Sequence, residues 1–212
     1  PDGAARSHHF SYERVALSRA TAMELGFAPA GGSDDARKPF VEVSGRKGLG
    51  VKADDLIDRL ITKALAEVTS RNADMLAEDA ARVAREIAVA AVRYFLIKFS
   101  RGKIIAFDLD EALSFEGESG PYIQYAVVRG RKILQNLQER LGVGEADVLA
   151  SLGRATHAEL DGASGTHEVW SLILETARLD DVIEQVVRTL EFSILAKYAF
   201  TVAQSFNAFY HR

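Results

Sequence analysis

A basic segment rich in glycine, residues 37–52, is the first part of the chain whose composition suggests chemistry. Its only acid is Glu42, and its net charge is +4. Glycine backbone lets N–H groups approach an anion closely while cations neutralise its charge, so the segment suits a polyphosphate. It is not a Walker A loop, and a solvated hairpin turn with surface lysines is the alternative. Its basic residues are Arg37, Lys38, Arg46, Lys47 and Lys52, and its glycines are Gly45, Gly48 and Gly50.

A helix predicted after Pro121 combines tyrosines with cations on one face. Aromatic rings stack on unpaired bases and cations meet phosphates, so such a face suits single-stranded RNA. The alternative is that the tyrosines pack in the core and the basic residues solvate the helix. The positions follow at steps of three and four residues: Tyr122, Tyr125, Arg129, Lys132 and Asn136. A second, apolar face is predicted from Ile123, Val127, Gly130, Leu134 and Leu137.

Residues 92–103 form a second basic segment, with no acid and a net charge of +4. Such a segment could follow a phosphate backbone. The alternative is a solvated helix end, because helix C-termini favour cations. The four basic residues are Arg93, Lys98, Arg101 and Lys103.

Several chemistries find no support in the sequence. There is no cysteine, which excludes disulfides, thiol chemistry and Cys-ligated zinc. No His-Glu-x-x-His or Gly-x-Ser-x-Gly motif occurs, and we predict no metal site. Glu111, Glu116 and Glu118 lie so close together in sequence that solvated carboxylates are the simpler interpretation. The chain therefore contains no self-sufficient catalytic set.

Composition places the chain among globular proteins. It has 212 residues, of which 48% are hydrophobic and 26% charged. No apolar run approaches the ~20 residues that a membrane helix needs, so we expect no membrane contact. The net charge of −4 argues mildly against coating nucleic acid by bulk charge. The absence of cysteine fits a reducing compartment, and we expect a cytoplasmic protein.

The elements that must position these residues change in character along the chain. Residues 1–50 are expected to hold a short strand over residues 10–17, a helical turn over 21–25 and two strands, 40–43 and 49–51. From residue 53 or 54 onward the apolar period is 3.6, which indicates helices up to about residue 71 and from 76 to the glycine at 102. Residues 104–107 read as a strand followed by an acidic turn. Helices follow from Pro121 to about Arg140 and over three further apolar patterns.

Taken together, the sequence resembles the arginyl-tRNA synthetases, which are class I aminoacyl-tRNA synthetases. The basic glycine segment resembles the family's form of the Lys-Met-Ser-Lys-Ser loop, and residues 120–126 with Arg129 resemble its most distinctive run. The other similar segments follow in family order: residues 51–57, 91–95, 107–110 and 113–117, and then Leu195, Tyr198, Ala203, Phe206, Asn207, Phe209 and Tyr210.

The resemblance implies a mostly α fold with two parts. Residues 1–115 would be the C-terminal end of a Rossmann-type catalytic domain, with a small α/β part, the signature loop and connecting helices. Residues 116–212 would be a helical anticodon-binding bundle, truncated at its end. The family's His-Ile-Gly-His motif and arginine pocket are absent, so we expect a fragment that is inactive alone. Glu42 stands where the loop motif has its first lysine, and its effect on ATP chemistry stays open.

The resemblance also implies roles for particular residues. The parent enzyme would use ATP with Mg²⁺ and no prosthetic group, join arginine to tRNA(Arg), and act as a monomer. Ser44, Arg46 and Lys47 would act on the ATP phosphates, helped by Gly45, Gly48 and Lys52. The anticodon loop would meet Tyr122, Gln124, Tyr125, Arg129, Tyr198 and Asn207, and the tRNA backbone would meet Arg93, Lys98 and Arg101. The alternatives are a stand-alone helical RNA-binding module and a structural helical domain with no RNA role.

Overall fold

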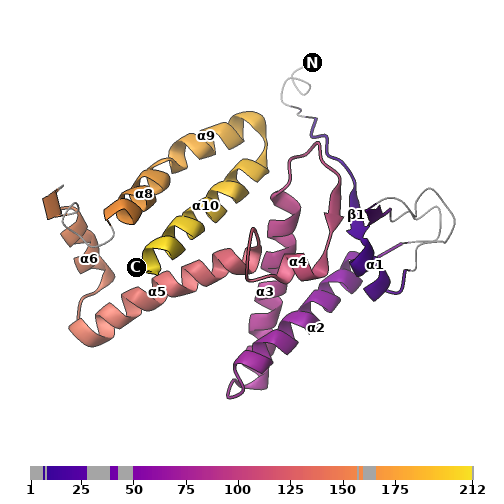
Figure 1. The fold of residues 1–212 in the computed structure, drawn as a ribbon, viewed down its shortest axis with the longest axis horizontal. Coiled ribbons are helices and arrows are strands. Elements are labelled where there is room, and N and C mark those ends of the chain that lie inside the picture. Colours follow the sequence, from indigo (N-terminus) through magenta and orange to yellow (C-terminus); the bar gives the residue numbers. More distant parts are fainter. Residues whose placement is uncertain are drawn as a thin grey trace. The chain divides into compact units, whose positions relative to one another are not determined.

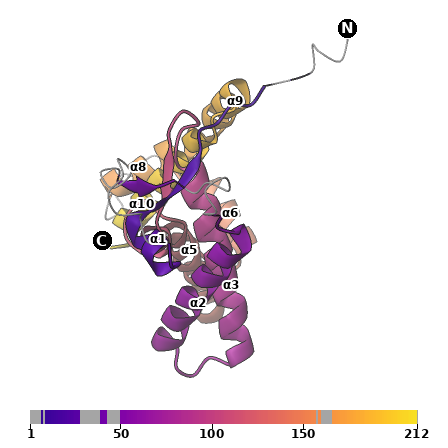
Figure 2. The same ribbon diagram turned by 90° about the vertical axis from the view of Figure 1, so that its right-hand side faces the viewer.

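The chain folds into two compact units, Pro1–Leu113 and Ser114–Arg212. The computed structural model describes residues 7, 9–27, 39–42, 50–156, 158–159 and 166–211. The division falls two residues before the boundary expected from the sequence, at 115/116. Figures 1 and 2 show a small sheet with helices in the first unit and helices alone in the described part of the second. The predicted fold class, mostly α with a small α/β part, is confirmed.

The sheet of the first unit has three short strands in the order β2-β1-β3. The strands are β1 (Val15–Ser18), β2 (Phe40–Val41) and β3 (Ile105–Phe107). β1 pairs antiparallel with β2 and parallel with β3, with Leu17 opposite both Val41 and Phe107. The expected strand over 49–51 is wrong for Gly50 and Val51, which lie outside any strand, and Leu49 is outside the described residues.

Two long helices, α2 (Ala53–Arg71) and α3 (Ala77–Ile97), fill the chain between β2 and β3. Each begins with two acids in its first turn, where they interact favourably with the helix dipole. The helices lie side by side in both ribbon views (Figures 1 and 2). Alanines at a spacing of four, from Ala80 to Ala88, are fully buried on α3, so α2 can pack closely against it.

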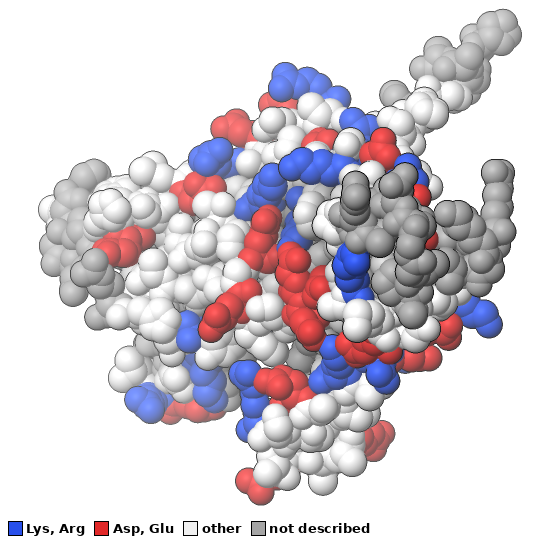
Figure 3. Space-filling view, turned by 45° about the vertical axis from the view of Figure 1, so that its right-hand side comes forward, with Lys and Arg blue, Asp and Glu red and all other residues white. Residues whose placement is uncertain are grey.

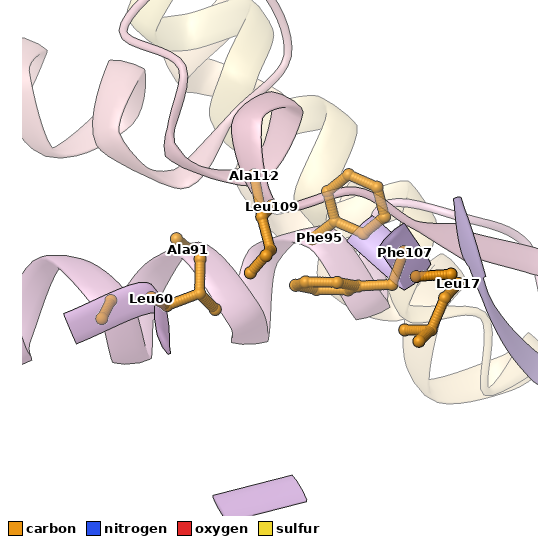
Figure 4. Close-up of a cluster of buried hydrophobic side chains, with 9 residues drawn as sticks. Leu17, Leu60, Ala91, Phe95, Phe107, Leu109 and Ala112 are labelled. Carbon is orange, nitrogen blue, oxygen red and sulfur yellow. The ribbon is translucent and has the colours of Figure 1, made fainter. Parts of the chain in front are cut away.

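The core of the first unit joins the sheet to these helices. Figure 4 shows the rings of Phe95 from α3 and Phe107 from β3, whose centroids are 4.8 Å apart. Leu17, Leu60, Leu109 and neighbouring alanines complete the same cluster. The short helices α1 (Arg19–Glu24) and α4 (Leu109–Leu113) cover it. α4 begins within the stretch that the sequence indicated as an acidic turn.

Side-chain oxygens lock α1 and α4 together. The Ser18 hydroxyl donates to Asp108 Oδ2 at 2.6 Å, and the Leu109 amide donates to Thr21 Oγ1 at 2.9 Å. Asp108 Oδ1 accepts from the Glu111 amide at 2.9 Å, which caps α4. Although burial raises the pKa of Asp108, these hydrogen bonds hold it below its ordinary value. The carboxylate is therefore the stable form at this junction.

The second unit is built around its last helix. The described helices are α5 (Gly120–Leu141), α6 (Glu145–Leu152), α8 (Thr166–Ala177), α9 (Leu179–Thr189) and α10 (Phe192–Tyr210). α10 packs against α5, α8 and α9. Figure 1 shows α8 and α9 following one another, with α10 returning alongside them. The apolar face predicted for α5 is only partly correct, because Val127 and Leu134 are exposed while Ala126 is buried.

Candidate nucleic-acid interface

The helix that carries the tyrosine–cation face, α5, has defined ends. Ser119 is its N-cap, and the Ser119 hydroxyl accepts a hydrogen bond from the Tyr122 amide at 3.3 Å. Pro121 occupies the first turn, where its missing N–H costs nothing. Gly142, with φ of +67°, ends the helix in the left-handed conformation. The sequence predicted both ends correctly to within a residue.

α10 runs in the same direction as α5 along the contact between them. Tyr122 packs on Phe200 with ring centroids 5.2 Å apart, and seven residues further on Arg129 meets Asn207. Small residues lie at the contact between the two helices. Ala126 and Ala203 are buried there, and Gly130 faces the Phe206 ring. Tyr122 is therefore half-buried at the contact between the helices. For this residue, the structure fits the alternative that the tyrosines pack in the core.

Four side chains surround the guanidinium group of Arg129. The Arg129 Nη1 atom is 3.0 Å from Asn207 Oδ1 and 3.2 Å from His211 Nε2, and Nη2 donates to the Tyr125 hydroxyl at 3.2 Å. The guanidinium carbon lies 4.3 Å from the centroid of the Tyr125 ring and 4.7 Å from that of Tyr210. We call this group the Arg129 cluster: Tyr125, Arg129, Asn207, Tyr210 and His211.

In the Arg129 cluster, the cation is surrounded by two aromatic rings, an amide and an imidazole. Among the described residues, no carboxylate lies within ion-pair distance of Arg129. Two ring contacts and three hydrogen-bonding partners fix the guanidinium, while Tyr125 and Tyr210 remain 47% and 46% exposed. A positioned cation between accessible rings offers charge to a phosphate and flat surfaces to an unpaired base.

Two other residues predicted for the anticodon surface lie outside this cluster. Tyr198 points to α8, and its hydroxyl donates to the Thr176 carbonyl at 3.2 Å. Burial, with Glu175 nearby, raises the pKa of Tyr198. Gln124 is half-buried, and within the described residues its buried Oε1 atom has no hydrogen-bond partner.

The predicted phosphate-backbone residues of the first unit have different surroundings. Arg93 is exposed on α3. Lys98 is only 6% exposed, and its ammonium pairs with Glu111 at 2.7 Å and lies over the Phe95 and Phe99 rings. Arg101 is half-buried with its guanidinium 5.0 Å from the centre of the Phe10 ring. Lys98 is thus an internal cation, which the sequence reading of a solvated basic run did not anticipate.

Of the residues predicted to act on ATP, Lys52 alone belongs to the described residues. Ser44, Gly45, Arg46, Lys47 and Gly48 lie outside the described residues. Lys52 is exposed at the N-cap of α2. Glu42 is described, and its carboxylate accepts from Arg14 Nη1 at 2.9 Å.

Sequence reasoning missed two members of the Arg129 cluster. The sequence alone singles out Tyr210 only through the family resemblance, and it assigns no role to His211. The available signal was helical: positions 207, 210 and 211 follow at steps of three and four and therefore share a face of α10.

Other features of the described residues offer less. No group of three or more His, Asp or Glu side chains there could hold a metal ion. A shallow depression of about 350 Å³ between the end of α5 and α6 is lined by Leu137, Val143, Val148, Ser151, Leu152 and Ala155. This lining is apolar and carries no cation, so it does not suit phosphate. None of the helices searched is long and apolar enough to cross a membrane.

Comparisons with known proteins place the sequence and the fold among similar proteins. Residues 123–212 match the family model of the DALR anticodon binding domain. Arginine–tRNA ligase of Pyrococcus furiosus is 34% identical over 99% of this chain, and that of Lactococcus lactis is 28% identical over 98%. The structure of Thermus thermophilus arginyl-tRNA synthetase superposes with a TM-score of 0.71 at 27% identity over 99% of this chain.

The second unit is thus similar to the DALR anticodon binding domain, a module named for its contact with the anticodon. The chain as a whole is similar to a segment of the arginine–tRNA ligases. It spans 29% and 34% of the two ligases named above and 28% of the Thermus chain. These matches favour a ligase segment over a stand-alone RNA-binding module.

Proposed function

We propose that this chain is part of an arginine–tRNA ligase and supplies that enzyme's anticodon-binding surface through the Arg129 cluster. The observation that carries the proposal is a guanidinium held between two half-exposed tyrosines, without a carboxylate among the described residues, inside the region that matches an anticodon binding domain. The bound partner is tRNA(Arg), whose unpaired loop bases stack on Tyr125 and Tyr210 while Arg129 meets a phosphate or a base edge.

The first unit completes this proposal on the ATP side. Ser44, Arg46 and Lys47, with Gly45, Gly48 and Lys52, bind and neutralise the ATP phosphates while arginine is activated, a step in which positioning and charge stabilisation dominate. The support is the sequence of the signature loop and the match to arginine–tRNA ligases along this unit. Mg²⁺ accompanies ATP, and we assign it no ligands in this chain.

Binding of a tRNA(Arg) transcript to the 212-residue chain tests the anticodon surface. Arg129→Ala is expected to weaken binding about tenfold, because a hydrogen bond to a charged group is lost. It should also reduce the slope of log K against log salt by about 1. Tyr125→Ala is expected to weaken binding by a similar factor through lost stacking while leaving the salt slope unchanged.

The matched control is Arg131→Ala, which removes the same charge from an exposed position on the same helix. An equal loss in Arg131→Ala and Arg129→Ala would mean that general positive charge, and not the cluster, attracts RNA. Circular dichroism of each variant checks that the helices persist. A separate assay of ATP–pyrophosphate exchange by this chain alone is expected to show none, since the His-Ile-Gly-His motif is absent. Measurable arginyl-adenylate formation would contradict that expectation.

A further inference from the structure

The imidazole of His211 has one protonation state that fits its surroundings. Its Nε2 atom is 3.2 Å from Arg129 Nη1. A guanidinium can only donate, so Nε2 must accept the hydrogen bond, and its proton must sit on Nδ1. His211 is therefore neutral when it contacts Arg129. A protonated imidazole would place two donors and two positive charges at contact distance.

Within the part of the chain that the structure describes, no acidic side chain compensates for such a charge. Among the described residues, His211 contacts Arg129 from α5 and Tyr210 from its own helix. Tyr125 and Asn207 contact the same guanidinium. Among the residues that the structure describes, no carboxylate is paired with either His211 or Arg129. Since the His211 side chain is exposed, a protonated ring can turn away into water.

We propose that His211 is a positioning residue, which as a neutral acceptor holds Arg129 in the orientation that binds RNA and makes that binding weaken at mildly acidic pH. The proposal rests on the RNA-binding function of the Arg129 cluster. Histidine is the side chain whose charge ordinarily changes between pH 5 and 8. On protonation the contact to Arg129 is lost, and the guanidinium keeps its hydrogen bonds to Asn207 and the Tyr125 hydroxyl and its contacts with the two tyrosine rings.

Binding of a tRNA(Arg) transcript at pH 8.0 and pH 5.5 tests this with two variants. His211→Gln keeps an acceptor at similar reach but does not titrate, and it retains every other histidine of the chain. We expect the affinity of wild type to fall about fivefold between pH 8.0 and pH 5.5, and that of His211→Gln to change by less than about twofold over the same range. His211→Ala should be about fivefold weaker than wild type at pH 8.0. Equal affinities of wild type and His211→Gln at both pH values, or tighter wild-type binding at pH 5.5, would overturn the proposal.

A measurement without RNA separates this proposal from the function on which it rests. The ¹⁵Nε–H resonance of Arg129 is followed by NMR from pH 8.0 to 5.5 in wild type and in His211→Gln. We expect a titration step in wild type that is absent in His211→Gln. If RNA does not bind at either pH but this step is present, the RNA function fails while the positioning contact stands. If the step is absent, the positioning role fails whatever the RNA result.

Discussion

At the scale of single residues, Lys98 is a buried cation that packs against aromatic rings of the core. Its stem and ammonium pack over Phe95 and Phe99, and Glu111, its ion-pair partner, is 56% exposed. Removing the cation leaves a carboxylate that water can still solvate, so the packing of the stem should matter more than the ion pair.

Lys98→Ala is therefore expected to lower the free energy of unfolding by about 2 kcal/mol, and Lys98→Met by less than about 1 kcal/mol. Urea unfolding followed by circular dichroism gives both values. Arg93→Ala, an exposed change on the preceding helix, is the control and should stay within about 0.5 kcal/mol of wild type. Equal costs for Lys98→Ala and Lys98→Met would show that the charge, and not the packing, dominates.

Asp108 gives the first unit an acid-sensitive junction. Burial opposes the charge, but the Ser18 hydroxyl and the amides of Glu111 and Asp110 hold the pKa of Asp108 below its ordinary value of 3.8. A carboxyl group whose pKa is lowered by folding stabilises the folded state above the unfolded pKa. That stabilisation is lost as the pH falls through the folded pKa.

Asp108→Asn keeps the shape of the side chain and removes the charge, so it should cost about 1 kcal/mol of unfolding free energy at pH 7. Thermal or urea unfolding between pH 7 and pH 2 should show this difference constant at higher pH and shrinking as the pH drops below 3.8. A difference that stays constant down to pH 2 would contradict the role of the carboxylate charge.

At the scale of elements, α5 contains two glycines whose replacement should have opposite effects. Gly130 lies within the helix, and a Cβ there would meet only the Phe206 ring at 3.8 Å, an ordinary contact. Gly142 ends the helix with φ of +67°, which residues with a Cβ adopt at a cost. Gly130→Ala should stabilise the chain by up to about 1 kcal/mol, and Gly142→Ala should destabilise it by about 1 kcal/mol.

Chemical unfolding of both variants gives the sign directly, and each serves as the control for the other. Destabilisation by Gly130→Ala would mean that α5 and α10 cannot accept one extra methyl group at their contact. The RNA affinity of Gly142→Ala is expected to stay at the wild-type value, since Gly142 lies more than three turns beyond Arg129 on the same helix.

Local patterns predicted the helices well because their causes are local. Ser119, Pro121 and Gly142 define α5 through bonds to their own neighbours, and the period of 3.6 reveals α2 and α3. The orientation of α5 is a different matter. Val127 is exposed and Tyr122 half-buried because α10 packs against the face with Ala126 and Gly130. That choice depends on a partner helix far along the chain, so the pattern of α5 alone could not predict it.

Likewise, the sequence predicted some residues of the candidate site and not others. Tyr125, Arg129 and Asn207 were singled out individually, and the structure brings them together. Lys98 and Tyr198 were singled out too, yet their side chains serve contacts within their own units. His211 was missed because its importance comes from a contact across two helices.

At the scale of the whole molecule, net charge is a poor guide to binding. Figure 3 shows both acidic and basic side chains on the face in view. The total of −4 includes two basic segments of +4 each. The Arg129 cluster owes its proposed affinity to the neutral partners of one cation, which a sum over residues does not detect.

The parallel pairing of β1 with β3 has a consequence for the order in which the first unit folds. Val15 pairs with Ile105, and the whole α2–α3 hairpin lies between them in sequence. Closing so long a loop is slow, whereas the contacts of the hairpin form between neighbours. Pulse-labelled hydrogen exchange during refolding should therefore find amides of α2 and α3 protected before those of β1.

The same order applies on the ribosome. β1 leaves the exit tunnel before β3, and its parallel pairing cannot form until residue 107 has been made. During that interval Ala16 and Leu17, which are buried in the finished unit, have no β3 to pair with or Phe107 to pack against. The nascent chain then carries an apolar strand whose sheet can close only after both long helices have been synthesised.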